Sequence, residues 1–299
     1  MSEMLKGLRF LKGHGTENDF VIVPDLDGLI DLGPAQVARL CDRRAGIGGD
    51  GLLRVVRSAA HPEAVRMAAE AEWFMDYRNA DGSVAEMCGN GVRVFARYLV
   101  LAGLAAEGEL AVATRAGVRR VRIAPDGPQG PGAVTVTMGR AEFPGPDRIE
   151  VAVGGRSWPA LNVNMGNPHA VAFVEDLDHA GDLFTAPPVT PADAYPTGVN
   201  VEFVVDRGPG HVAMRVHERG SGETRSCGTG ACAVMVAAAR RDGLDPAVTG
   251  KPASYLVDLP GGRLEITELV DGTVEMTGPA VILAEGVVDA VWLEGTLPG

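Results

Sequence analysis

The stretch MCGNGVR (Met87–Arg93) places Cys88 between turn-forming residues and an apolar run typical of a helix. The first N–H groups of a helix have no partner within it, and its N-terminus carries partial positive charge. Both features favour a reactive thiolate over the thiol. A buried structural cysteine is the alternative, because free cysteine is among the most buried residue types. This stretch by itself leaves both interpretations open.

A second copy of this arrangement, Cys227-Gly228-Thr229-Gly230, favours the reactive interpretation. Each cysteine precedes an apolar run of similar length, and a polar residue stands nine positions earlier, Asn79 before Cys88 and Glu218 before Cys227. Further upstream, Asn18 and Asn200 each open an aromatic-apolar strand. Three features in the same order predict duplicated domains related by a pseudo-two-fold axis. The two thiols are then expected to face each other across a cleft.

Two opposed thiols fit a two-base inversion at carbon. One sulfur removes a proton from one face of the carbon, and the other delivers a proton to the opposite face. The two helix N-termini offer N–H groups to a substrate carboxylate and stabilise the charge that develops as the Cα–H bond breaks. The spacing therefore predicts an acid–base pair.

Other roles for the two cysteines fit the sequence less well. A disulfide would fill the site, and no C-x-x-C or H-E-x-x-H spacing supports zinc. An acyl-transferring nucleophile needs only one such cysteine. Pyridoxal phosphate needs a Schiff-base lysine, and none of the three lysines lies near either cysteine or a glycine-rich phosphate loop. We therefore expect no cofactor and no metal.

Many short strand-like runs and few helices predict an α+β protein rather than a doubly wound α/β fold. The loop Gly46–Gly51 matches G-x-G-x-x-G, but it leads into a strand-like run, which disfavours a dinucleotide site. The proline- and glycine-rich segment 125–132 marks a domain boundary, with domains over residues 1–130 and 131–278. Cys41 and Cys232 lie on apolar helix-like faces and are predicted to be core residues.

Composition limits the class of partner. The net charge of −12 argues against nucleic acid or an anionic membrane surface. The N-terminal stretch lacks the apolar segment of a signal peptide, and the longest apolar runs are too short to span a bilayer. We expect a soluble cytoplasmic protein that acts on a small molecule.

Taken together, the motifs resemble those of the diaminopimelate epimerases, the cofactor-independent enzymes of lysine and peptidoglycan-precursor synthesis. The resemblance covers nearly the whole chain, and the motifs that carry it are Asn18-Asp19-Phe20, Gly46-Ile47-Gly48-x-Asp50, Asn79–Ser83, Glu86–Arg93, Phe95–Tyr98, Met165–His169, Asn200, Glu218-Arg219-Gly220, Gly222-Glu223-Thr224, Cys227–Ala231 and Asp258–Gly262. It implies two pseudo-symmetric domains, each a barrel-like sheet around a central helix, with the active site in the cleft between them. It also implies that residues 279–299 return to the first domain, and that the protein forms the homodimer usual in the family.

The resemblance further implies the role of each site residue. Cys88 and Cys227 would act on opposite faces of the Cα of LL- or meso-diaminopimelate, with His169 and Glu218 adjusting their protonation. Backbone N–H groups of four residues would hold the reacting carboxylate: Gly89, Asn90, Gly228 and Thr229. Five side chains would hold the rest of the substrate: Asn18, Asn79, Asn167, Asn200 and Arg219, the last suited to a bidentate contact with the distal carboxylate.

Three departures from the family pattern and one alternative function remain. Thr16-Glu17 replaces the more common Leu-Gly before Asn18. Gly51 stands where many members carry a glutamine that contacts the substrate, and His217 stands where tyrosine is frequent and is expected to be exposed. The alternative is a proline or hydroxyproline racemase of the same fold. In that family the first motif tends to be Cys-Gly-His-Gly, whereas Asn90 occupies the histidine position here.

Overall fold

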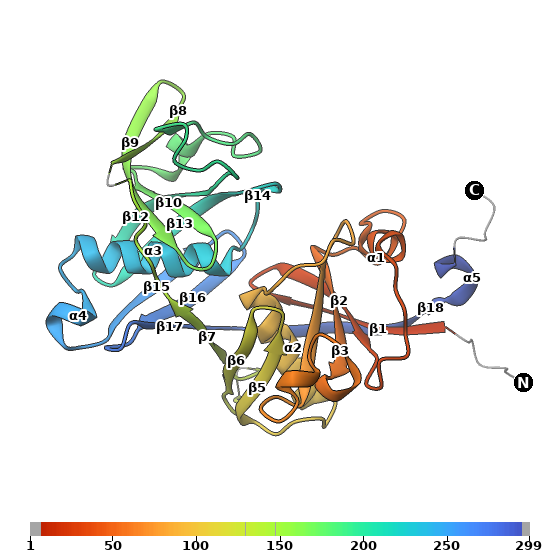
Figure 1. Cartoon of the computed structure of the whole chain (residues 1–299). Helices are drawn as coiled ribbons and strands as arrows, with labels where there is room; N and C mark the ends of the chain where they lie inside the picture. Colours follow the sequence, from red (N-terminus) through yellow and green to blue (C-terminus); the bar gives the residue numbers. More distant parts are fainter. Residues whose placement is uncertain (1–6, 129, 147, 295–299) are drawn as a thin grey trace, which may run out of the picture. The chain divides into compact units, whose positions relative to one another are not determined.

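The computed structural model describes residues 7–128, 130–146 and 148–294 (Figure 1). The two ends of the chain that the sequence assigns to the first domain, residues 1–6 and 295–299, lie outside the described residues. The chain divides into two compact units, one from Met1–Val136 with Pro279–Gly299 and the other from Thr137–Gly278. The division falls within strand β7 (Val134–Arg140). Mostly strands with few helices, the fold has the α+β composition that the sequence predicts.

The first unit is a sheet packed around one buried helix. Its strands pair in the order β18–β1–β2–β3–β4–β5–β6–β7, and all neighbours are antiparallel except β2–β3 and β4–β5. The elements are β1 (Gly7–Gly15), β2 (Asn18–Pro24), α1 (Pro34–Cys41), β3 (Gly51–Arg57), β4 (Trp73–Asn79), α2 (Gly89–Leu101), β5 (Gly108–Thr114), β6 (Gly117–Ile123), β18 (Val281–Asp289) and α5 (Ala290–Leu293), with short 3₁₀ turns at Ser58–Ala60 and Val65–Met67. Helix α2 packs against strands along the sheet from β18 to β6 (Figure 1). Every residue from Gly89 to Leu99 is buried, including the polar Asn90 and the charged Arg93 and Arg97, so the first unit encloses α2 on nearly all sides.

The second unit has the same construction around helix α3 (Gly228–Arg241). Its strands pair in the order β8–β9–β10–β12–β13–β15–β16–β17, with the short β11 on β8 and β14 on β13. The elements are β8 (Ile149–Val153), β9 (Arg156–Asn164), β10 (Pro168–Phe173), a 3₁₀ turn (Leu177–Ala180), β11 (Val189–Thr190), β12 (Asn200–Gly208), β13 (His211–Glu218), β14 (Gly222–Glu223), α4 (Pro246–Thr249), β15 (Ala253–Leu259), β16 (Gly262–Glu268) and β17 (Thr273–Gly278). The pairings found among the described residues do not close either sheet into a barrel.

The internal repeat is confirmed by the order and direction of the strands. In the first unit β2 pairs with β3 in parallel, β3 with β4 antiparallel, and β4 with β5 in parallel, and the buried helix lies between β4 and β5 in the chain. The second unit repeats this order: β10 pairs with β12 in parallel, β12 with β13 antiparallel, and β13 with β15 in parallel, with the buried helix between β13 and β15. Asn79 ends β4 and Glu218 ends β13, so these two residues correspond as the spacing predicts.

The strand register corrects the other correspondence. Phe20 pairs with Gly51 in the first unit, and His169 pairs with Asn200 in the second. Asn200 therefore corresponds to Gly51, and Asn18 corresponds to Asn167 rather than to Asn200. The prediction that Asn18 and Asn200 are equivalent is wrong because it matched two similar strand openings without knowing which strands pair.

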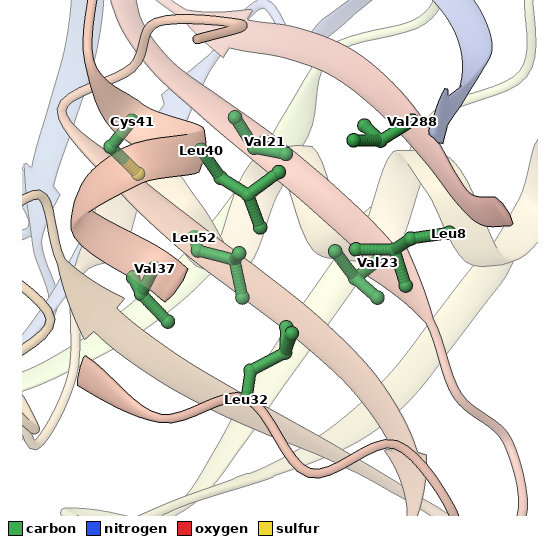
Figure 2. Packing of buried hydrophobic residues seen from close by; sticks show 9 residues of the cluster. All are labelled: Leu8, Val21, Val23, Leu32, Val37, Leu40, Cys41, Leu52 and Val288. Atoms are coloured by element: carbon green, nitrogen blue, oxygen red, sulfur yellow. The ribbon is translucent and has the colours of Figure 1, made fainter. Parts of the chain in front are cut away.

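Cys41 and Cys232 are core residues, as predicted. Cys41 points from α1 into an apolar cluster (Figure 2), whose other buried members are Leu8, Val21, Val23, Leu32, Val37, Leu40, Leu52 and Val288. Cys232 is fully buried in α3. His217 departs from expectation: it is buried, and its Nδ1 lies 2.7 Å from the carbonyl oxygen of Leu183.

Among the helices in the described part of the chain, none combines the length and the apolarity that crossing a bilayer requires.

Candidate active site

Each unit carries one cysteine at the N-terminus of its buried helix. Cys88 is the N-cap of α2 with an extended backbone (φ −137°, ψ 119°), and its Sγ accepts a hydrogen bond from Gly91 N at 3.4 Å. Cys227 is the N-cap of α3 (φ −116°, ψ 109°), and its Sγ accepts from Gly230 N, also at 3.4 Å. Both sulfurs thus occupy the position where a capping side chain satisfies an otherwise unpaired N–H group. The placement of both thiols at helix N-termini, predicted from the sequence, is confirmed.

In the first unit, Asn18 and Asn90 lie beside Cys88. The amide oxygen of Asn18 is 3.5 Å from Cys88 Sγ and accepts a hydrogen bond from Asn90 Nδ2 at 3.2 Å. Asn18 Nδ2 donates to Asp50 Oδ2 at 2.7 Å. Because Asp50 accepts from the amide nitrogen, the amide oxygen of Asn18 is held toward the thiol.

Asp50 belongs to a charged network that the sequence did not predict. Arg43 Nη2 donates to Asp50 Oδ1 at 2.7 Å and to Asp19 Oδ1 at 2.6 Å, and Lys12 Nζ contacts Asp19 Oδ2 at 2.6 Å. Burial raises the pKa of Asp19, but the hydrogen bonds from Arg43 and Lys12 outweigh it and hold that pKa far below its ordinary value. The network fixes the turn on which Asn18 stands.

Asn79 and Gly51 lie opposite each other where β4 ends and β3 begins. Asn79 Nδ2 donates to Ser83 Oγ at 2.9 Å, and the described contacts do not join its side chain to Cys88. A Cβ on Gly51 would stand 2.5 Å from the carbonyl oxygen of Arg78, which is closer than a Cβ atom comes to a non-bonded backbone oxygen. The glutamine common at this position in the family therefore does not fit the backbone found here.

In the second unit, Cys227 is almost fully buried, with 4% of its surface exposed. Thr229 Oγ1 lies 3.6 Å from its sulfur. Burial raises the pKa of the Cys227 thiol well above its ordinary value, and the nearby carboxylates of Glu218 and Glu202 raise it further. The expectation that the helix end favours a thiolate is wrong for Cys227, because burial and two like charges outweigh the helix N-terminus.

Glu218 is held at the end of β13. Its Oε1 accepts a hydrogen bond from the Thr224 hydroxyl. Burial raises the pKa of Glu218, while hydrogen bonds from Thr224 and from the Cys227 thiol act in the opposite direction. Glu218 is therefore a carboxyl with a raised pKa in direct contact with the Cys227 thiol.

His169 and Glu202 form a buried pair close to Cys227. His169 Nδ1 lies 2.6 Å from Glu202 Oε1, and His169 Nε2 lies 3.0 Å from Asn167 Oδ1. Both His169 and Glu202 are 0% exposed. The predictions placed His169 at the site but missed Glu202. One signal was available, because strand alternation puts residue 202 on the same face as Asn200, and a carboxylate among apolar neighbours there is a buried charge.

Asn200 and Arg219 are linked across β12 and β13. Arg219 N donates to Asn200 Oδ1 at 2.9 Å, which fixes the Asn200 amide. The exposed Arg219 guanidinium is held by Thr197, through its carbonyl oxygen at 3.4 Å and its hydroxyl at 3.3 Å. These contacts leave most guanidinium donors available for an anion.

The chain matches the family model described as diaminopimelate epimerase over residues 10–144 and 161–283. It is 75% identical over 290 residues to a diaminopimelate epimerase of Streptomyces coelicolor, covering 97% of this chain and 98% of that protein. The chain belongs to the diaminopimelate epimerase family. The resemblance inferred from the motifs is thereby confirmed.

Solved structures share the fold at much lower identity. A phenazine biosynthesis protein of the PhzF family from Bacillus anthracis has 17% identity and a TM-score of 0.69, over 95% of this chain and 99% of that one. A hydroxyproline epimerase from Agrobacterium vitis has 14% identity and a TM-score of 0.67, over 98% of this chain and 96% of that one. These two likenesses establish the two-domain epimerase fold and nothing about substrate.

Proposed function

We propose that this chain is a diaminopimelate epimerase, an isomerase that interconverts LL- and meso-2,6-diaminopimelate without a cofactor. The observation that carries the proposal is the duplicated cap: in each of two units with the same topology, a cysteine caps a buried helix and accepts an N–H group at 3.4 Å. Membership of the family supports diaminopimelate as the substrate. The product would serve lysine and peptidoglycan-precursor synthesis.

The reaction requires one base and one acid on opposite faces of the substrate Cα. In one direction a Cys88 thiolate removes the Cα proton, and the Cys227 thiol delivers its own proton to the other face. The roles exchange in the reverse direction. The electron pair of the broken Cα–H bond spreads into the adjacent carboxylate, where preorganised N–H donors stabilise it most effectively.

The helix N-termini are the donors proposed for that carboxylate. The backbone N–H groups of Gly89 and Asn90 in α2, and of Gly228 and Thr229 in α3, lie in the first turn of each helix, ahead of Val92 and Ala231, which donate to the carbonyl oxygens of Cys88 and Cys227. This is the part of a helix whose N–H groups bind anions. Since each thiol stands at the same helix end as its two donors, carboxylate binding brings the Cα within reach of the sulfur.

The remaining polar residues are assigned to substrate binding and to proton control. Arg219 would bind the distal carboxylate through its fork of donors. Asn18, Asn79, Asn167 and Asn200 would hold the amino and carboxylate groups. Glu218 and His169 would adjust the protonation of Cys227, a role supported by the contact between Glu218 and the thiol.

The alternative, a proline or hydroxyproline racemase, has support from the fold alone, through solved structures at 14% and 16% identity. Asn90 stands where that family tends to carry histidine, and its Nδ2 hydrogen-bonds Asn18. A pyrrolidine substrate also has no second amino-acid head for Arg219 to bind.

The test incubates the purified enzyme with LL-diaminopimelate, and separately with L-proline, in D₂O without added cofactor. We expect deuterium at the α-carbon and the meso product with diaminopimelate alone. Exchange into proline but not into diaminopimelate would overturn the proposal. The proposal includes the homodimer usual in the family, which light scattering on the eluting protein checks.

A further inference from the structure

The N-termini of α2 and α3, each with its capping cysteine, have equivalent backbones, but different side chains pack against them. In the second unit these side chains are His169 and Glu202. The register pairs His169 with Asn200, and Glu202 follows Asn200 by two residues on β12. By the register, their counterparts in the first unit are Phe20, which pairs with Gly51, and Leu53, two residues after Gly51. All four side chains are 0% exposed. The pair at the N-terminus of α3 is therefore an acid and a base, His169 and Glu202, whereas the corresponding pair at the N-terminus of α2 is apolar.

The glycines of the two helices show that these residues lie against the caps. A Cβ on Gly91 would meet Leu53 Cδ2 at 3.3 Å and Phe20 Cζ at 3.6 Å. A Cβ on Gly230 would meet Glu202 Oε1 at 2.8 Å and Cys227 Sγ at 3.1 Å. Because both atoms lie this close to the same position, the Glu202 carboxylate and the Cys227 sulfur are separated by no more than the roughly 4–6 Å over which a like charge disfavours ionisation.

We propose that Glu202 is a positioning residue that makes the two thiols unequal: it holds the His169 ring through Nδ1, and its charge keeps Cys227 as the proton-bearing thiol of the resting enzyme. This inference rests on the two-thiol function proposed above. An enzyme with two opposed thiols is ready to react only when one is charged and the other is not. An asymmetric environment fixes which one carries the proton.

The charged groups around Cys227 come from three strands. Glu218 on β13 contacts the thiol, Glu202 on β12 faces it through Gly230, and His169 on β10 binds Glu202. Within the described residues Glu202 Oε2 has no hydrogen-bond partner, so His169 satisfies only one of the two carboxylate oxygens. Tyr195 also faces this carboxylate, and burial together with the Glu202 charge raises the pKa of its phenol.

The test measures the pH dependence of alkylation at Cys227 and at Cys88 separately, by iodoacetamide labelling and peptide mass spectrometry on the intact chain. In Glu202→Gln, which keeps the shape of the side chain, we expect the Cys227 midpoint to fall by at least about one pH unit, a tenfold gain in thiolate at a fixed lower pH. The Cys88 midpoint should not move. Glu202→Asp, which keeps the charge, should restore the wild-type Cys227 midpoint.

Glu268→Gln is the matched control. Glu268 is a buried carboxylate on the same unit, bound by Arg240 through two contacts of 2.7 Å at the opposite end of α3. Removing it should leave the Cys227 midpoint unchanged. An unchanged Cys227 midpoint in a folded Glu202→Gln, or an equal shift in Glu268→Gln, would overturn the proposal. The labelling needs no substrate, so failure of diaminopimelate turnover with the shift intact would count against the proposed function alone.

Discussion

Alanine in place of Gly230 should be far more damaging than alanine in place of Gly91, although both glycines occupy the third position of a helix that follows a capping cysteine. Alanine favours a helix interior by about 0.5–1 kcal/mol over glycine, so each substitution begins with the same modest gain. At Gly91 the three atoms nearest to the new Cβ are all carbons, Leu53 Cδ2 at 3.3 Å, Cys88 Cβ at 3.4 Å and Phe20 Cζ at 3.6 Å. The free energy of unfolding of Gly91→Ala should stay within about 1 kcal/mol of the wild type.

At Gly230 the new Cβ would lie 2.8 Å from Glu202 Oε1, so the carboxylate must move. Overpacking costs about 1–3 kcal/mol. Movement also weakens the Glu202–His169 hydrogen bond, and a hydrogen bond to a charged group contributes about 1.5–3 kcal/mol. After the gain in helix propensity, we expect Gly230→Ala to lose about 2–4 kcal/mol.

Urea unfolding followed by circular dichroism measures both free energies, and epimerisation of diaminopimelate at 25 °C measures the effect on the site. Gly230→Ala should also lose most of its kcat, because the same Cβ lies 3.1 Å from the Cys227 sulfur. A Gly230→Ala protein as stable and active as Gly91→Ala would refute the packing argument around Glu202.

Three further perturbations test other parts of the structure. Thr224→Val removes the hydroxyl that lowers the pKa of Glu218, so the acidic limb of the kcat/KM–pH profile should move to higher pH, whereas Thr224→Ser should keep it in place. Gly51→Gln should destabilise the protein by about 1–3 kcal/mol in urea without lowering KM, since a Cβ there meets backbone; a lower KM would show that the backbone adapts. Burial raises the pKa of Asp76, but hydrogen bonds from Arg78 and Arg115 outweigh it, so this carboxyl has a pKa below its ordinary value. Its contribution to stability is full above the unfolded pKa of about 4 and is lost as pH falls through the folded pKa; urea midpoints at pH 7 and pH 3 should differ less in Asp76→Asn than in the wild type.

The two capping cysteines could be predicted because their signal is local. A cysteine, two glycines and an apolar run predict a helix start without any knowledge of the sheet. The second copy at Cys227 then favoured a reactive role for Cys88 over a structural one. The same holds for the loop Gly46–Gly51, which leads into β3 as expected rather than into a helix.

The parts that could not be predicted depend on strand pairing. The correspondence of Asn200 with Gly51, and the contact of His169 with Glu202, both follow from the parallel pairing of β10 with β12, which joins segments separated by a long loop. The high pKa of Cys227 also lay outside the sequence pattern, because burial and carboxylates from other strands, not the helix end, decide it. Local motifs therefore identified the site, and the surrounding sheet determined its electrostatics.

The most direct test of the two-thiol account replaces each cysteine singly with alanine and follows epimerisation of LL-diaminopimelate in D₂O. Cys88→Ala and Cys227→Ala should each abolish formation of the meso product. Cys232→Ala, which changes a buried cysteine five residues beyond Cys227 in the same helix, should retain it. Meso product formed at the wild-type rate by either Cys88→Ala or Cys227→Ala would contradict the account.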